Sequence, residues 1–341
     1  MVQLIENSSS KLRILVSGVG GDTGQGVVKS LQKSDLNIEV FGMCIKAESP
    51  FLYKVDHGLV APKSADPDYI PFLIKTIKKY SIDLFVPTID SEIPLIALNR
   101  DRIEAETESR VLVGNSDHVA IANDKLSTAV FLEEIGVKHP RTVLASDSQG
   151  VNNLLLGGYP VVVKPRSGNG SIGVRNVSSP DELLPFLGKE SYIVQEWLDP
   201  QGGEYTTGIY TSRHTPNKAK CTLLRELKNG STFIATRVID DSLDGPLEHI
   251  AGILDVPYLN IQSMCVNGEL SVFELNPRLS GTTAIVSRVF NPVELFIREV
   301  ILGQSPNFNV DTEAFIAMRY LEEHYEAVQR VNNTRLSGLT S

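Results

Sequence analysis

Cysteine is scarce in this sequence, with only Cys44, Cys221 and Cys265 among 341 residues. These cysteines are scattered, and no CxxC or Cys/His pattern occurs. We therefore expect neither a disulfide framework nor a structural zinc site. The usage is typical of a reduced, cytoplasmic protein.

Long apolar runs and an excess of positive charge are also missing. No run approaches the roughly 18 residues needed to cross a bilayer, and residues 1–11 lack the regions of a signal peptide. Asp and Glu number 41 against 32 Lys and Arg, which gives a net charge of −9. Because nucleic acids and anionic membranes attract basic surfaces, we expect neither as a partner.

The remaining composition is that of an ordinary globular protein, with 42% hydrophobic and 21% charged residues. This length predicts two domains, or three, and no internal repeat is visible. The first segments follow a βαβ order: a strand at 12–17, a glycine-rich loop at 18–26, a helix from Val27 and a strand at 38–42. A dinucleotide site is not favoured, since Met43 and Cys44 stand where the acidic ribose partner belongs. The loop fits a smaller anionic or polar substrate, or only a tight turn.

The next segments of the same unit are a helix at 68–80 and strands at 84–87 and 111–113. Asp90 and Glu92 follow the strand at 84–87, and ligands bind at the carboxyl ends of parallel strands. These two residues are candidates for a substrate amine or hydroxyl. Alternatively they only cap the following helix.

A second unit is predicted from about residue 117. Asp124 is expected to cap a helix at 125–135, and Ser116 a shorter helix before it. Further expected elements are strands at 161–164, 192–196, 205–211, 220–227 and 231–239, and helices at 180–187, 244–254, 283–290, 292–302 and 313–329.

The run Val161-Val162-Val163-Lys164 opens into a loop with glycines at 168, 170 and 173. Glycine lets backbone N–H groups approach an anion, and a nearby lysine adds a point charge for phosphate. A hairpin turn with a surface lysine would explain the stretch equally well. The pattern is not a P-loop, because no Gly-Lys-Ser/Thr follows the glycines.

Several motifs in a fixed order decide between these alternatives. They are Asn123-Asp124-Lys125, the loop after Lys164, the stretch from Tyr192 to Leu198, Gly203-Glu204-Tyr205-Thr206, and Phe273-Glu274-Leu275-Asn276-Pro277-Arg278. Over residues 10–305 this order resembles the ATP-grasp superfamily, above all single-unit members similar to carbamoyl-phosphate synthetase ATP-binding units and to amino-acid ligases. The resemblance implies an α/β fold with a parallel-sheet, Rossmann-like pre-ATP-grasp domain at 1–116. A two-lobed α+β ATP-grasp domain would span 117–305, with a lid lobe at roughly 126–196, followed by a tail at 306–341.

The resemblance also implies an ATP site. Lys125 and Lys164 would meet the α- and β-phosphates, and Glu204 the ribose hydroxyls. Residues 167–173 would form the lid over the triphosphate, and the adenine would lie against the stretch at 195–198. The residues implied for the lid and adenine are Ser167, Gly168, Gly170, Ser171, Gly173, Gln195, Glu196, Trp197 and Leu198.

The resemblance further implies a Mg²⁺ site, with Mn²⁺ as a substitute, at Gln262, Glu274 and Asn276. Many relatives carry an acidic residue at the first of these positions, so Gln262 lowers the negative charge of the site. A hairpin around Asn267-Gly268 brings these side chains to one face only if its loop has three residues, Val266 to Gly268. That register also places Leu259, Ile261, Phe273 and Leu275 towards a core.

The implied catalytic groups include three arginines. Arg278 would bind the γ-phosphate and the acyl-phosphate formed from it. Arg225 and Arg288 are expected either at a substrate carboxylate or in surface ion pairs.

The expected function is an ATP-dependent ligase that joins a small-molecule carboxylate to an amine and releases ADP. One alternative is a carbamoyl-phosphate-synthetase-like unit acting on bicarbonate or carbamate. Another is a nucleotide-binding module without catalysis. The terminal parts could bury a homodimer surface.

Overall fold

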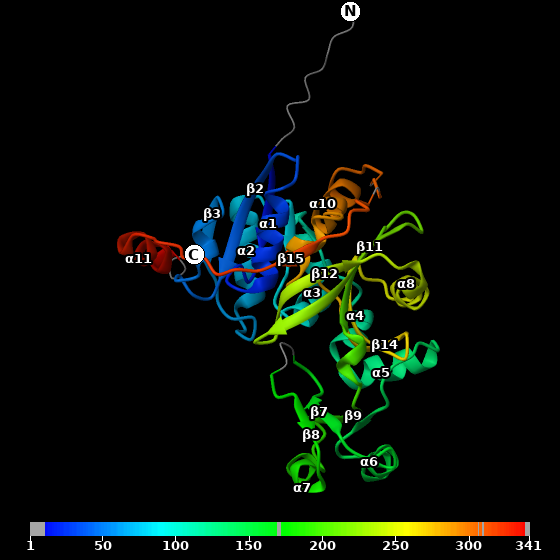
Figure 1. Ribbon diagram of the computed structural model, residues 1–341. Helices are drawn as coiled ribbons and strands as arrows, with labels where there is room; N and C mark the ends of the chain where they lie inside the picture. The colour runs from blue at the N-terminus through cyan, green and yellow to red at the C-terminus, as the bar shows by residue number, and fades with distance from the viewer. Residues whose placement is uncertain (1–10, 169–171, 306, 309, 338–341) are drawn as a thin grey trace, which may run out of the picture.

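The computed structural model describes residues 11–168, 172–305, 307–308 and 310–337 (Figure 1). An N-terminal α/β layer and a large antiparallel sheet form the main body, and a smaller lobe projects from it. The expected fold class, a Rossmann-like domain followed by a two-lobed α+β domain, is confirmed. No helix among the described residues is long and apolar enough to span a membrane.

The N-terminal sheet is fully parallel, with strand order β3-β2-β1-β4-β5. Its inner strands β1, β2 and β4 are largely buried and rich in β-branched and aromatic residues, as strands covered on both faces must be. The order reverses between β1 and β4, and ligands bind at such switch points. The elements are β1 (Leu12–Val16), α1 (Asp22–Leu31), β2 (Ile38–Cys44), η1 (Pro50–Tyr53), β3 (His57–Val60), α2 (Tyr69–Tyr80), β4 (Leu84–Val86), α3 (Ile93–Thr107) and β5 (Arg110–Val111).

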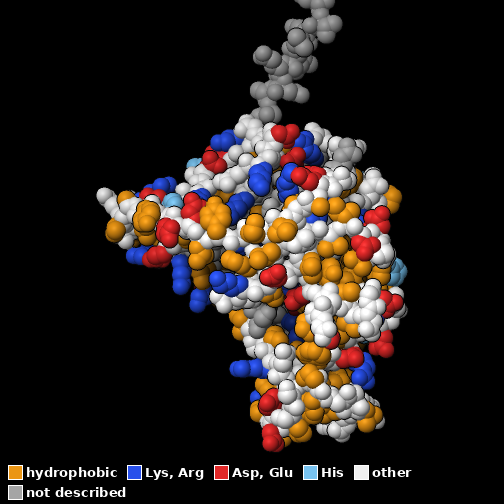
Figure 2. Space-filling view, in the orientation of Figure 1, with side chains coloured by type: hydrophobic (Ala, Val, Ile, Leu, Met, Phe, Trp, Pro, Cys, Tyr) orange, Lys and Arg blue, Asp and Glu red, His pale blue; other side chains and the backbone are white. Residues whose placement is uncertain are grey.

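A four-stranded sheet of order β6-β9-β7-β8 forms the projecting lobe, which we call the lid lobe after the role that the resemblance implies. Its small core includes Val163, Val194 and Leu154. Figures 1 and 2 show this lobe as a narrow extension below the main body. Two helices lead into it, and the full set is α4 (Ser116–Asn123), α5 (Lys125–Glu134), β6 (Thr142–Leu144), α6 (Ser148–Leu155), β7 (Val161–Pro165), β8 (Arg175–Val177), α7 (Pro180–Leu183), η2 (Leu184–Phe186) and β9 (Tyr192–Glu196).

The large sheet is antiparallel, with order β14-β13-β10-β11-β12-β15. Its hairpins turn at Asn229-Gly230 and Asn267-Gly268, where all four residues have positive φ as type I′ turns require. The elements are η3 (Pro200–Gly202), β10 (Glu204–Thr211), β11 (Lys218–Lys228), β12 (Ser231–Val238), η4 (Asp241–Leu243), α8 (Asp244–Ile253), β13 (Tyr258–Val266), β14 (Glu269–Asn276), α9 (Thr283–Val286), α10 (Pro292–Phe296), the π-helix η5 (Ile297–Ile301), β15 (Ile316–Met318) and α11 (Val328–Ser337).

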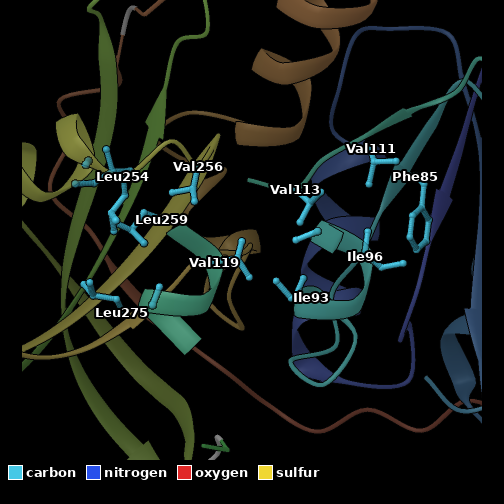
Figure 3. Close-up of a cluster of buried hydrophobic side chains, with 14 of the residues drawn as sticks. Phe85, Ile93, Ile96, Val111, Val113, Val119, Leu254, Val256, Leu259 and Leu275 are labelled. Carbon is cyan, nitrogen blue, oxygen red and sulfur yellow. The ribbon is translucent and has the colours of Figure 1, made fainter. Parts of the chain in front are cut away.

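One hydrophobic core joins the N-terminal domain to the large sheet. Figure 3 shows Ile93 and Ile96 of α3 on one side, Leu259 and Leu275 of the sheet on the other, and Val119 of α4 between them. Because buried side chains pack densely, this shared core fixes the two parts against each other. The carboxyl ends of the parallel strands therefore keep a constant position relative to the large sheet.

Four local expectations were wrong. The stretch at 18–26 is not all loop, because α1 begins at Asp22 rather than at Val27. The predicted helix at 313–329 is replaced by β15, because Ile316 to Met318 pair with β12, and a helix begins only at Val328. The helix predicted at 283–290 ends at Val286. The short helix before Lys125 is capped by the Asn115 side chain, which accepts from Asp117 N, rather than by Ser116.

Candidate active site

A cavity of about 290 Å³ lies between the lid lobe and the large sheet. β7 and β9 of the lobe form one wall, and β10, β11, β13 and β14 form the other. Eleven of the predicted site residues line it: Lys125, Lys164, Gly168, Gln195, Glu196, Trp197, Leu198, Glu204, Arg225, Gln262 and Glu274.

Apolar side chains that were not among the predicted site residues complete the cavity. Val162 and Val174 come from the lobe, and Leu227, Met264 and Phe273 from the sheet. They form an apolar slot with a few polar groups at its edge, which is the usual environment for a planar ligand. The period-2 alternation of the strands would have identified Leu227 and Met264, because each lies two residues from a predicted polar residue on the same face.

Lys164 enters the cavity from β7 and is only 5% exposed. Its ammonium lies 5.5 Å from the centre of the Phe273 ring. Burial lowers the pKa of Lys164 to about 8, and the nearby Glu274 carboxylate partly opposes this effect. No carboxylate of the described residues is within ion-pair distance, so the charge of Lys164 is free for an incoming anion.

Lys125 begins α5 at the same edge of the cavity. Asp124 Oδ1 caps this helix by accepting from Ser127 N at 2.8 Å, as predicted, and Asp124 also pairs with Arg166. Lys125 Nζ donates to Gly168 O at 2.5 Å, so this lysine holds the start of the glycine loop. Both lysines of the motif therefore meet at the loop.

Arg225 connects two predicted site residues on the large sheet. Its guanidinium pairs with Glu204, which lies directly opposite on β10, and Nη2 donates to Gln262 Oε1 at 2.9 Å. The three side chains come from neighbouring strands and share one face.

For the predicted metal ligands on β13 and β14, the expected cross-strand pairing is correct, but the expected cause of that register is wrong. Gln262 lies opposite Glu274, and Asn260 opposite Asn276, as expected. The loop, however, has two residues, and the one-residue offset arises from a β-bulge at Phe273. The bulge turns Phe273 into the cavity, beneath Lys164, instead of towards the core.

The residues present fit one Mg²⁺. Glu274 and Asn276 lie two positions apart on one face of β14, with Asn276 Nδ2 3.3 Å from Glu274 Oε1. Carboxylate and amide oxygens are suitable ligands for this hard cation, which commonly also binds nucleotide phosphates. Among the described residues, no group of three or more His, Cys, Asp or Glu side chains forms a metal site alone. Phosphate oxygens would therefore complete the coordination.

A small second hollow adjoins the first, and Asp90, Asn123, Lys125, Asn276 and Arg278 line it. Arg278 forms an ion pair with Asp90 and donates to Asn276 Oδ1 at 3.3 Å. Asp90 follows β4 at the switch point of the parallel sheet. The hollow thus brings together the N-terminal domain and the end of β14.

Glu92 does not reach either hollow. Its carboxyl is fully buried and accepts hydrogen bonds from Ser17 Oγ at 2.7 Å and from the Tyr69 hydroxyl. Burial raises its pKa to about 7, against the lowering effect of these donors. Neither a ligand role nor helix capping describes it, because its side chain makes no cap hydrogen bond. It ties the loop after β4 to the end of β1.

The structure does not bring every candidate to the site. Arg288 is mainly exposed and pairs with Asp311 and Glu313. Ser167 and Gly173 do not line the cavity. Gly170 and Ser171 lie outside the described residues.

Two family models match this chain. Residues 14–111 match the PylC-like N-terminal domain, and residues 122–208 match an ATP-grasp domain. Asp90 of the site lies within the first match and Lys164 within the second. Glu274 lies beyond both matches.

Individual proteins match over shorter segments. The carbamoyl-phosphate synthase of Methanobrevibacter smithii is 34% identical over 110 residues, which cover 31% of this chain and 29% of that protein. A D-alanine–D-alanine ligase of Pseudomonas putida is 32% identical over 103 residues, 28% of this chain and 32% of the relative. The chain thus spans about a third of the length of these curated relatives.

Solved structures agree over most of the chain. The N5-carboxyaminoimidazole synthetase of Staphylococcus aureus, solved with ADP, superposes with a TM-score of 0.72 at 16% identity, covering 92% of this chain and 83% of that one. The corresponding synthetase of Thermus thermophilus gives 0.68 at 17% identity, with 87% and 80% covered. At such identities the likeness shows the fold alone.

Fold and cavity together define the class, a two-lobed protein with its cavity between lid and sheet. The two domain matches and the ordered motifs then specify the family. The chain carries an ATP-grasp domain at residues 122–208, preceded by a PylC-like N-terminal domain at 14–111.

Proposed function

We propose that this protein is an ATP-dependent, ADP-forming ligase that activates a carboxylate and transfers it to an amine. The observation that carries the proposal is the meeting of two hollows at Lys125. One hollow is apolar and ends in buried cations, and the other contains a paired arginine and carboxylate.

The first hollow suits ATP. The adenine would lie between Val162 and Met264, with its edge against the backbone at residues 196–198, and the ribose near Glu204. Lys164 and Lys125 would bind the phosphates at the base of the glycine loop, and Glu274 and Asn276 would hold Mg²⁺. When bound, the ion neutralises phosphate charge and orients the phosphoryl group.

The charged groups around the second hollow suit the substrate carboxylate, which is the phosphoryl acceptor. The substrate would lie beside the hollow, because its volume of about 10 Å³ holds no more than a water molecule. Attack of the substrate carboxylate oxygen on the γ-phosphorus forms one P–O bond, breaks the bond to the β-phosphate oxygen and leaves ADP. Arg278 is placed to stabilise the charge on the transferred phosphoryl group. Asp90 is placed to hold the protonated amine, which must lose a proton before it displaces phosphate.

A second candidate is phosphorylation of bicarbonate or carbamate. The similarity to a carbamoyl-phosphate synthase supports it, at 34% identity over 110 residues, which is close to the 32% of the D-alanine–D-alanine ligase. The charged groups of the two hollows serve either acid equally well. A homodimer and a cytoplasmic location stay predictions.

The test is to incubate the protein with Mg-ATP and panels of amino acids, hydroxy acids or bicarbonate, and to identify the nucleotide product by chromatography. We expect ADP, formed faster when an amino-acid-like acid and an amine are both present. Stimulation by bicarbonate alone would favour the second candidate. AMP as the main product would contradict both, because it requires cleavage between the α- and β-phosphates.

A further inference from the structure

Arg225 lies in the part of the cavity where Gln262 would face a metal ion. β10 separates the two residues: Arg225 is opposite Glu204, and Gln262 is opposite Thr206. The Arg225 side chain is only 10% exposed. It points across β10 rather than into solvent.

Three hydrogen bonds hold the guanidinium in this position. Nε donates to Glu204 Oε1 at 3.1 Å, Nη2 donates to the same oxygen, and Nη2 also reaches Gln262 Oε1. Arginine stays charged at all ordinary pH values and keeps its donors in a rigid plane. A fixed positive charge therefore lies next to the Gln262 oxygen.

This charge makes a second divalent cation at Gln262 unfavourable. Such an ion would meet a like charge close by, and its side-chain ligands would be a neutral amide and the Glu274 carboxylate, which it would have to share with the ion at Asn276. Glu204, the carboxylate on the Arg225 side of Gln262, is already paired with Arg225. The carboxylate that remains for a metal on this face is Glu274, on the opposite side of Gln262 from Arg225.

We infer that the nucleotide complex of this protein holds a single divalent cation, at Glu274 and Asn276, and that the Arg225 guanidinium supplies the positive charge on the Gln262 side. The inference rests on the proposed function only in requiring that the cavity binds nucleotide. It assigns Arg225 a role towards the phosphates in place of a second ion.

The test counts bound Mn²⁺ by electron paramagnetic resonance in the full-length protein, saturated with ADP or with the β,γ-imido analogue of ATP. We expect one tightly bound Mn²⁺ per nucleotide in the wild type. The double variant Arg225→Met with Gln262→Glu should bind a second Mn²⁺ at least tenfold more tightly than the wild type does. Arg225→Lys, which keeps the charge, should bind one.

The matched control is Arg237→Met, which removes one positive charge from the neighbouring strand β12. Arg237 donates to Glu313 O and does not line the cavity. This variant should bind one Mn²⁺, and a second ion here would contradict the inference, because the effect would then follow from net charge.

Two ions in the wild-type complex would overturn the inference while leaving the proposed function intact. Failure of the wild type to bind either nucleotide would overturn the proposed function as well. Circular dichroism checks that the double variant is folded. If it is not folded, the number of Mn²⁺ ions bound to the wild-type complex still tests the inference.

Discussion

The lid lobe and the large sheet hold their cations in different ways. Lys164 of the lobe is buried against Phe273 and has no carboxylate within ion-pair distance among the described residues. On the sheet side, Arg225 pairs with Glu204 and Arg278 with Asp90. Burial without a partner lowers the pKa of a cationic side chain. An ion pair opposes this lowering and also holds the side chain in one position. The comparison indicates that the sheet is preorganised and that the lobe cation gains its partner only from a bound anion.

The paired arginine at the second hollow should have the largest effect on catalysis. Arg278→Met removes the donor proposed for the transferred phosphoryl group, and we expect turnover to fall by roughly 100- to 1,000-fold. Nucleotide affinity should change much less, since Arg278 does not line the first hollow. Steady-state kinetics and calorimetric titration with ADP measure the two effects. Equal losses in both would contradict the distinction between the hollows.

Glu92 extends the comparison to a buried acidic side chain. No cation among the described residues pairs with it. Its pKa is raised from 4.5 to about 7, so the folded protein keeps the proton that the unfolded chain loses. The contribution of Glu92 to stability is therefore fully present below about pH 4.5 and is lost as the pH rises through 7. The expected loss is on the order of 3 kcal/mol.

Glu92→Gln should remove this loss, because the amide does not ionise. Urea unfolding of both proteins between pH 5 and 8 measures the difference, and other titrating groups cancel in it. Parallel pH profiles for the wild type and the variant would show that Glu92 does not titrate in this range.

Lys164 should give the smallest effect of the three, a pH dependence of nucleotide affinity. Its pKa of about 8 means that the free protein loses the charge as the pH rises through 8, while bound phosphate favours the charged form. We expect ADP affinity to fall by about tenfold per pH unit above 8, the limit for loss of one proton. Lys164→Arg, which stays charged, should show a flat profile when titrated calorimetrically from pH 7 to 9.5. A flat wild-type profile would contradict the unpaired state of this lysine.

Much of the fold follows from local patterns. The strands at Tyr192–Glu196 and Leu12–Val16 are short, largely buried runs that include β-branched residues, and the helix at Lys125–Glu134 begins at the Asp124 cap. The strand at His57–Val60 was missed, since it is a four-residue edge strand with little alternation. β15 was also missed, because its pairing with β12 is a long-range contact that overrides local helix preference.

In the site, too, features set by local sequence were predicted and features set by long-range contacts were not. Ordered motifs identified Lys125, Lys164 and Glu274, since each stands in a recognisable local stretch. The bulge at Phe273 could not be distinguished from a longer turn, because either adds one residue and shifts the register equally. Asp90 and Glu92 could not be separated either. Their different environments depend on Arg278 and Tyr69, which are distant in sequence.

The most direct test of the account uses Trp197, the single tryptophan of the chain, which lines the cavity. If the cavity is the nucleotide site, Mg-ATP should change the Trp197 emission in a saturable way, and Lys164→Met should shift that titration to at least tenfold higher concentrations. Calorimetric binding of ATP with no change in emission, in the wild type, would place the nucleotide elsewhere and contradict the account.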